Sequence, residues 1–193
     1  GATEADFNRF GAFALGDGSS DAALLATRAS GPSTADIAST DAENRVVLTE
    51  LYLDSEISSA RLTNLSTRAP VGTGDDVLIG GFVITGESPR RCLIRAAGES
   101  LADFSITSPF IDPQLQIFPS GSTQVIAYND DWKTGSSSTN IANEGARVGA
   151  FDFTDNSRDA VLIVTLDPGA YTAVVSDLAE TTGTSLVEIY ILE

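Results

Sequence analysis

The sequence contains no histidine, no methionine, one cysteine (Cys92), one lysine (Lys133) and one tryptophan (Trp132). Without histidine, the chain lacks the side chain that most often serves as a general base or as a transition-metal ligand. A single cysteine excludes an intramolecular disulfide, and a serine–lysine pair would depend on Lys133, which lies in a polar stretch. We therefore expect no catalytic residues and a protein that is not an enzyme.

Positive charge is also scarce, with 11 Lys and Arg against 27 Asp and Glu and a net charge of −16. Such a surface repels phosphate groups, so nucleic acid is not an expected partner. No apolar run approaches the roughly 18 residues of a membrane span, and none is expected. The abundance of Ser, Thr, Ala, Gly and Asp, together with a first residue that is not methionine, favours a secreted protein with a processed N-terminus, located extracellularly or at the cell surface.

What the sequence does contain, from about residue 45 onward, is a series of short apolar runs separated by turn residues. They are rich in Val, Ile, Leu, Thr and Tyr and too short for typical helices, so they predict strands. The fold class expected is all-β, an antiparallel, jelly-roll-like β-sandwich over residues 45–193, preceded by an N-terminal extension over residues 1–44. The predicted strands are 46–53, 61–65, 77–84, 91–96, 114–118, 124–128, 160–166, 170–176 and 185–192, and short helical turns are expected only in 98–104 and 140–149.

Several details follow from the alternation of side chains in these runs. Asp167-Pro168-Gly169 lies between two runs and predicts a hairpin. The run at 185–192 is apolar on both faces apart from Glu188, so both faces should be buried, against the rest of the chain or against a neighbouring subunit. Cys92 is expected to be a small core residue. The other expected core residues are Val77, Ile79, Leu93, Leu115, Ile117, Leu162, Val164, Tyr171 and Val175.

Carboxylates are the one abundant functional group. The best organised are Asn129, Asp130 and Asp131, which follow a predicted strand, with Asp112 before another. No cofactor is required by the sequence, but oxygen ligands of this kind could hold calcium. The alternative is an ordinary solvated loop. Tyr128 and Trp132 beside these acids could stack on a polysaccharide or matrix ligand, and the competing interpretation is that Trp132 folds back over the edge of the core.

Two sets of motifs resemble known secreted proteins. The segments RLTNLSTR at 61–68, VGTGDDVLIGGF at 71–82 and CLIRA at 92–96 resemble the LxNLSTR, VGTGDxVLIGGF and VLIRAxGPSL motifs of a β-rich repeat module in large cell-surface proteins of Verrucomicrobia and Planctomycetes. Cys92 stands here for an aliphatic residue, and GESL follows in place of GPSL. The segments DPQLQI, YNDDW and LDPGAYTAVV are similar to bacterial pre-peptidase C-terminal domains. The resemblance covers about residues 61–193 and implies a surface module without catalytic residues.

The N-terminal extension suggests how such a module could be used. Residues 5–15 include Phe7, Phe10, Phe13 and Leu15, and three phenylalanines left in water would forfeit about 1.5–3 kcal/mol each. The hypothesis is that this segment pairs as a strand with a neighbouring copy, which makes the protein a structural subunit of an extracellular filament or surface assembly, a homopolymer. The segment could instead return to its own sandwich. The alternative function is a monomeric module that binds carbohydrate or matrix.

Overall fold

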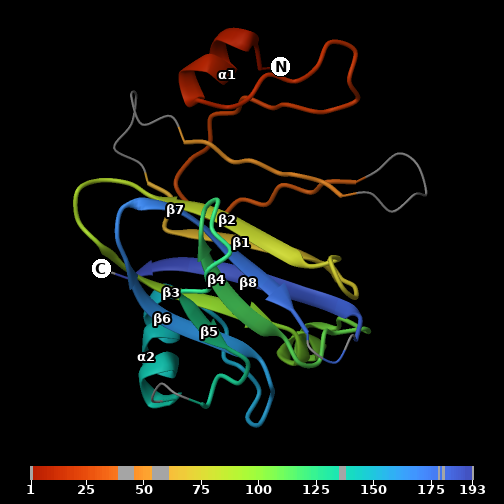
Figure 1. Ribbon diagram of the computed structural model, residues 1–193, viewed down its shortest axis with the longest axis vertical. Coiled ribbons are helices and arrows are strands. Elements are labelled where there is room, and N and C mark those ends of the chain that lie inside the picture. The colour runs from red at the N-terminus through yellow and green to blue at the C-terminus, as the bar shows by residue number, and fades with distance from the viewer. Residues whose placement is uncertain are drawn as a thin grey trace. The chain divides into compact units, whose positions relative to one another are not determined.

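The computed structural model describes residues 2–38, 46–53, 61–134, 138–177, 179 and 181–192. The chain forms two compact units, Gly1–Leu62 and Thr63–Glu193, and each is described here by itself. Unit 2, Thr63–Glu193, contains two antiparallel four-stranded sheets (Figure 1). The prediction of an all-β antiparallel sandwich is therefore confirmed.

Each sheet contains four of the eight strands. The first sheet has the order β1-β8-β3-β6, and the second has the order β2-β7-β4-β5. The pairs β1–β8, β2–β7, β3–β6 and β4–β5 are those expected of a jelly roll. The strands are β1 Asn64–Val71, β2 Leu78–Ile84, β3 Arg90–Ala97, β4 Gln114–Pro119, β5 Ala127–Asn129, β6 Ala160–Leu166, β7 Gly169–Ser176 and β8 Gly183–Leu192.

This topology corrects the predicted hairpin at Asp167-Pro168-Gly169. The turn does connect β6 to β7, but β6 pairs with β3 and β7 pairs with β2 and β4, so the turn carries the chain from one sheet to the other. Among the eight strands of the described residues, only β4 and β5 are paired strands that follow each other in sequence. Their connection begins with a turn in which the Ser122 amide donates to the Pro119 carbonyl and Gly121 adopts a φ of 74°, which favours glycine.

The main core lies between the sheets. Cys92, Leu115, Ile117 and Val175 belong to it, as predicted, and all four are fully buried. Leu162, Val164 and Tyr171 pack against it while partly buried. The predictions for Val77 and Ile79 are wrong. Leu78 faces inward, so Ile79 faces outward and is 54% exposed, while Val77 precedes β2 and is only partly buried outside the core. A shift of one residue reverses every side chain in a strand.

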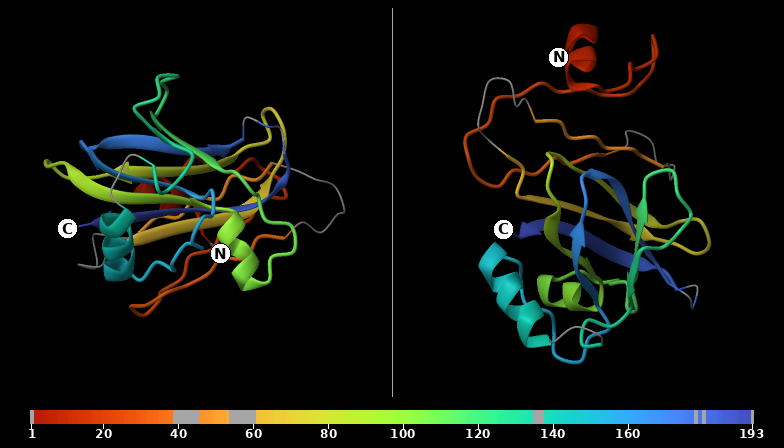
Figure 2. Two further views of the ribbon diagram at one scale, coloured as in Figure 1. Left: turned by 90° about the horizontal axis from the view of Figure 1, so that it is seen from below. Right: turned by 60° about the vertical axis from the view of Figure 1, so that its left-hand side comes forward.

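A second apolar cluster covers the outer face of the first sheet. Leu93 belongs to it rather than to the main core, together with Trp132, Ile141, Tyr190 and Leu192. Helix α2, Ser138–Val148, supplies Ile141, and a glutamate of this helix, Glu144, pairs with Arg91 of β3. Figure 2 shows α2 beside the sheet that contains β3 and β8. The expectation that β8 is buried on both faces is therefore confirmed, and the covering elements belong to the same chain.

A short helix follows β3, where a helical turn was expected. This 3-10 helix, η1, spans Glu99–Phe104, and Gly98 is its N-cap residue. A Cβ on Gly98 would lie 1.8 Å from the carbonyl oxygen of Phe110, so only glycine fits this close approach of two backbones. The predicted helical segment at 140–149 corresponds to α2.

Unit 1, Gly1–Leu62, is organised differently. Its only helix in the described residues is α1, Glu4–Phe10, which Thr3 caps and Gly11 ends. The predicted strand conformation of residues 5–15 is therefore wrong for residues 5–10. Residues 46–53 form no strand, which corrects a second prediction. The first strand begins at Asn64; the predicted domain boundary at residues 44–45 lies outside the described residues and stays a prediction.

Candidate functional site

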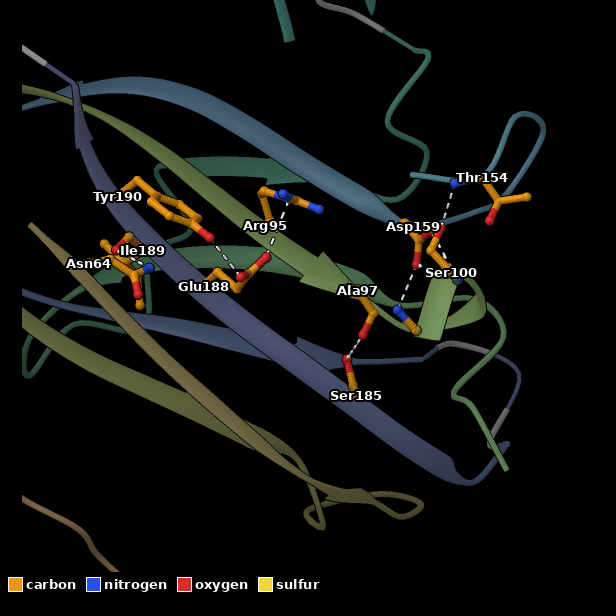
Figure 3. Close-up of polar contacts among 11 residues, drawn as sticks. Asn64, Arg95, Ala97, Ser100, Thr154, Asp159, Ser185, Glu188, Ile189 and Tyr190 are labelled. Atoms are coloured by element: carbon orange, nitrogen blue, oxygen red, sulfur yellow. Dashed lines mark hydrogen bonds and ion pairs between the residues drawn. The ribbon is translucent and has the colours of Figure 1, made fainter. Parts of the chain in front are cut away.

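The outer face of the first sheet contains a buried ion pair. Arg95 of β3 and Glu188 of β8 are directly opposed in the strand register, and Arg95 Nε lies 3.5 Å from Glu188 Oε2. The Tyr190 hydroxyl donates to Glu188 Oε1 over 2.8 Å (Figure 3). Both charged residues are about 95% buried. Breaking such a pair leaves an uncompensated charge in a low dielectric, so the three side chains act as one structural group.

Electrostatics in this group follow from its burial. Burial lowers the pKa of Arg95, and the nearby Glu188 charge opposes that shift. Burial also raises the pKa of Tyr190, and the Glu188 carboxylate adds to the shift. The tyrosine therefore remains a hydroxyl donor well above neutral pH. The arrangement therefore combines a buried charge pair with a tyrosine hydroxyl that stays protonated.

Two aromatic rings enclose the Arg95 guanidinium. Its Cζ atom lies 4.4 Å from the Phe151 ring centroid and 4.1 Å from that of Phe153. Beside it is a cavity of about 230 Å³, and Arg95 Nη2 and Trp132 Nε1 have no hydrogen-bond partner among the described residues. Because Glu188 balances the arginine and Asp152 also lines the cavity, the space suits an uncharged ligand better than an anion. Its principal walls are Leu93, Arg95, Trp132, Ile141, Phe151 and Phe153.

A second buried polar group surrounds Asp159. This fully buried carboxylate accepts hydrogen bonds from the Gly98 amide and the Ser157 hydroxyl, each at 2.6 Å. It also accepts from the hydroxyl of Ser100, which lies beside it in Figure 3. The Ser100 oxygen also accepts from the Thr154 amide. The buried Ser100 hydroxyl therefore already donates to Asp159 and accepts from Thr154, and the sequence contains no histidine to activate it. The network fixes η1 against the strand that begins after Asp159.

The residues predicted to hold calcium make other contacts. The Asn129 amide oxygen accepts from the Val161 amide, and its nitrogen donates to the Asp131 carbonyl. Asp112 pairs with Arg158 at 2.6 Å, and Asp130 accepts from the Tyr128 hydroxyl. In the described parts of the chain, no group of three or more carboxylate, cysteine or histidine side chains is arranged to hold a metal ion. Calcium binding by these loops stays a prediction.

The pKa of Asp112 reflects its burial and the charges around it. Burial raises its pKa, Arg158 opposes the shift, and the charges of Asp131, Asp177 and Asp130 add to it. The hydrogen bond to Asp130 likewise raises the pKa of Tyr128. The acidic loops therefore lie near one another, and one arginine neutralises part of their charge.

Tyr128 and Trp132 are not equivalent. Tyr128 is half-exposed on β5, and its hydroxyl accepts from the Gln114 amide. Trp132 is buried in the second apolar cluster, with its ring edge-to-face against Phe153. The interpretation that Trp132 folds over the edge of the core is therefore confirmed, and the two aromatic side chains serve different environments.

Of the residues predicted to contact another subunit, Phe7 and Phe10 lie on α1, Phe13 is 58% exposed, and Leu15 is partly exposed. The Phe10 ring packs near Tyr52, with 6.2 Å between centroids. More generally, none of the described residues of unit 1 is buried. The large apolar side chains that unit 1 exposes are Phe13, Leu24, Leu25, Ile37, Val46, Val47, Leu48, Leu51, Tyr52, Leu53 and Leu62.

Sequence reasoning missed the Arg95 group and the cavity beside it. One signal was present, because Glu188 is the single charge of β8 and Arg95 lies within the otherwise apolar stretch 92–97 of β3, and such charges require partners. Phe151 and Phe153 gave no signal, since they lie in a segment without periodicity. Asp159 and Ser100 meet only through the fold.

Comparisons with known proteins assign no family. No family model matches the chain, and no curated protein matches it. Among solved structures, the pre-peptidase C-terminal domain of a collagenase from Bacillus anthracis is similar over 65% of this chain and 88% of that one, at 14% identity and a TM-score of 0.40. Within the described residues, no helix has the length and apolar character needed to cross a membrane.

Proposed function

We propose that the protein is a non-enzymatic structural subunit of an extracellular filament or surface assembly, in which the N-terminal unit of one copy docks on the sandwich of the next. The observation that carries the proposal is the exposure of unit 1. Its described part buries no residue while presenting many large apolar side chains to water. Burying each such side chain is worth about 1.5–3 kcal/mol, so a partner that covers several of them gains considerable free energy.

A second copy of the chain is the partner that this arrangement favours. Every copy carries one exposed N-terminal unit and one sandwich with open sheet edges. A contact between two different surfaces of identical subunits repeats from copy to copy and gives a ring or a filament. The net charge of −16 opposes close contact, and salt screens that repulsion over about 8–10 Å. Polymerisation should therefore increase with ionic strength.

The non-enzymatic and extracellular parts of the proposal have separate support. The chain has no histidine, its one cysteine is buried, and burial raises the pKa of that thiol to about 11. A protonated, enclosed thiol is not a nucleophile. The motif resemblance at 61–96 to secreted cell-surface modules supports a surface location. In this proposal calcium is an optional ion at the acidic loops, and assembly does not depend on it.

Sedimentation velocity and negative-stain electron microscopy of the full chain test the proposal. We expect polymers that grow with salt. The double variant Phe7→Asp, Phe13→Asp should lose polymer and keep the melting temperature of the sandwich, whereas Ile111→Asp, which changes an exposed apolar residue of unit 2, should retain polymer. A chain that remains monomeric at all salt and protein concentrations would refute the proposal. A destabilised sandwich in the double variant would show that the segment belongs to its own core.

The cavity beside Arg95 favours one alternative function, binding of an uncharged carbohydrate. Its aromatic walls could pack on the apolar face of a sugar ring. Trp132 lines this cavity and is the only tryptophan, so its fluorescence reports on this site alone. Saturable change on titration with neutral monosaccharides, lost in Phe153→Ala, would support the alternative. An unchanged spectrum up to high sugar concentration would exclude it.

A further inference from the structure

We infer that residues 46–53 of one copy add as a strand to the free edge of β2 in another copy. This inference rests on the proposed function and names the two surfaces that meet. It assigns the strand pairing to residues 46–53, and residues 5–15, which are partly helical, contact the neighbouring copy through side chains only. Strand addition supplies main-chain hydrogen bonds for affinity and side-chain contacts for specificity.

The donor segment has the composition of a strand but forms none. Residues 46–53 read VVLTELYL, contain neither proline nor glycine, and consist mostly of residues that favour strands. They adopt no helix or strand, and Val46, Leu48 and Leu51 are 99%, 72% and 62% exposed. A strand requires a partner for its backbone, and the described residues give 46–53 no backbone hydrogen-bond partner. The segment is therefore ready to pair.

The sandwich has four strands at its sheet edges, β1, β6, β2 and β5, and three of them are poor acceptors. β1 contains Pro70 and Arg68, residue types that protect edges from pairing. β5 has only three residues. The start of β6 is already covered, because the Val161 amide donates to the Asn129 side chain and the neighbouring Asp159 carbonyl accepts from the Trp132 amide.

β2 has none of these protections. Its seven residues, LIGGFVI, include no charge and no proline, and the strand pairs with β7 on one side only. Its outward face exposes Ile79 by 54% and Val83 by 64%, with Gly81 between them in open space. A long, uncharged and apolar edge strand is the kind that pairs with another chain.

The two faces of the donor match the two faces of this edge. Val47, Leu51 and Leu53 alternate onto one face, and Val46, Leu48 and Tyr52 share the other face with Glu50. With the first face turned inward, it extends the main core beside Leu78 and Ile84, both of which are buried. The second face then lies beside Ile79 and Val83, and the Glu50 carboxylate stays in water. The opposite orientation would bury that carboxylate without a partner.

Cysteine cross-linking between differently marked chains tests the pairing directly. In a Cys92→Ala background, one chain carries Leu48→Cys and the other carries Val83→Cys. Mixed under oxidising conditions, they should form covalent heterodimers, and Leu48→Cys mixed with a control chain carrying Ile111→Cys should form none. Each chain has a single thiol, so a heterodimer reports contact between copies. A chain that carries both Leu48→Cys and Val83→Cys tests pairing within one molecule. If this chain forms an internal disulfide while the mixed single-cysteine chains form no heterodimer, the segment docks in its own molecule and the inference is overturned.

Protection of the edge provides the second test. The variant Ile79→Lys, Val83→Lys should need about tenfold more protein to polymerise, because lysine on an edge strand disfavours pairing. The matched control Val125→Lys, Ile126→Lys also replaces two exposed apolar residues with lysine, and it should polymerise as the wild type does. Circular dichroism checks that both variants are folded. If both polymerise normally, the β2 contact is wrong and the proposed function stands; if the wild type never polymerises, both fail.

Discussion

The two units of this chain contain similar kinds of apolar residues and use them differently. In Thr63–Glu193 these residues alternate along paired strands and fill a core between two sheets, with a second cluster under α2. In Gly1–Leu62 they are scattered among Ser, Thr, Ala, Gly and Asp, and no described residue is buried. Apolar content therefore does not by itself make a core. Regular spacing and a partner strand are also needed.

The largest expected effect compares two phenylalanines, one from each unit. Phe110 is fully buried in the main core, and Phe13 is 58% exposed. Phe110→Ala should destabilise the protein by about 3–5 kcal/mol because it leaves a cavity. Phe13→Ala should change the free energy of unfolding by less than about 0.5 kcal/mol. Urea unfolding followed by circular dichroism, in protein too dilute to polymerise, measures both.

An equal loss of unfolding free energy in the two phenylalanine variants would contradict the contrast between the two units. It would mean that Phe13 belongs to a cooperative core in the isolated chain. The protein must be dilute because assembly stabilises the folded state. The contacts of Phe13 with a neighbouring copy would then add to the measured free energy of unfolding.

A smaller effect comes from Cys92 inside the sandwich. Burial raises the pKa of its thiol to about 11, from an ordinary value of 9.0. Above pH 9 the unfolded chain loses this proton while the folded chain keeps it, so stability falls by about 2–3 kcal/mol as pH rises towards 11. Cys92→Ala should flatten the dependence of the unfolding midpoint on pH between 9 and 10. Tyr190, whose pKa is raised mainly by burial, accounts for a further loss at higher pH in both proteins.

The pH experiment reports on the interior of the sandwich alone, so it tests the core of unit 2 without a contribution from unit 1. An unchanged slope in Cys92→Ala between pH 9 and 10 would contradict the assignment. The thiol would then titrate in the folded state as it does in the unfolded chain, and Cys92 would not be enclosed.

The smallest effect concerns α1 in unit 1. The Thr3 hydroxyl accepts from the Asp6 amide, and the Asp6 carboxylate accepts from the Thr3 amide at 2.9 Å. Since α1 buries no residue, this capping box should stabilise it by about 1 kcal/mol without help from packing. Thr3→Ala should speed amide hydrogen exchange in residues 4–10 about fivefold and leave global unfolding unchanged.

A surface control separates this local effect from a general one. Thr67→Ala changes an exposed threonine of β1 and should leave exchange in residues 4–10 as it is. If Thr3→Ala lowered the global midpoint, α1 would contribute to the sandwich and the two units would not be independent.

The sequence predicted those elements whose signals are local. The strand at 160–166 is found with the same bounds, and both expected helical segments are present, because residue type and alternation act within a few residues. The strand at 46–53 has the same local signal and does not form. A strand depends on a partner, and composition does not supply one. In the proposed assembly that partner comes from another copy.

The candidate site was less predictable than the fold. Cys92 was placed in the core by its position in an apolar run, and the folding back of Trp132 was anticipated. The ring contacts of Phe151 and Phe153 with Arg95 and the closure of Asp159 onto Gly98 join segments far apart in sequence. Their geometry depends on how the sheets and η1 pack, which no periodicity encodes.

Residue type and short-range spacing were enough to predict the all-β class, most strand positions, the acidic surface and the absence of histidine chemistry. Three features became visible only in the folded chain. They are the inward face of β2, the crossing of Asp167-Pro168-Gly169 between sheets, and the covering of the outer face of the first sheet by α2. These outcomes depend on register and on contacts between distant segments. Such contacts are selected by the combined burial of many side chains and by no single motif.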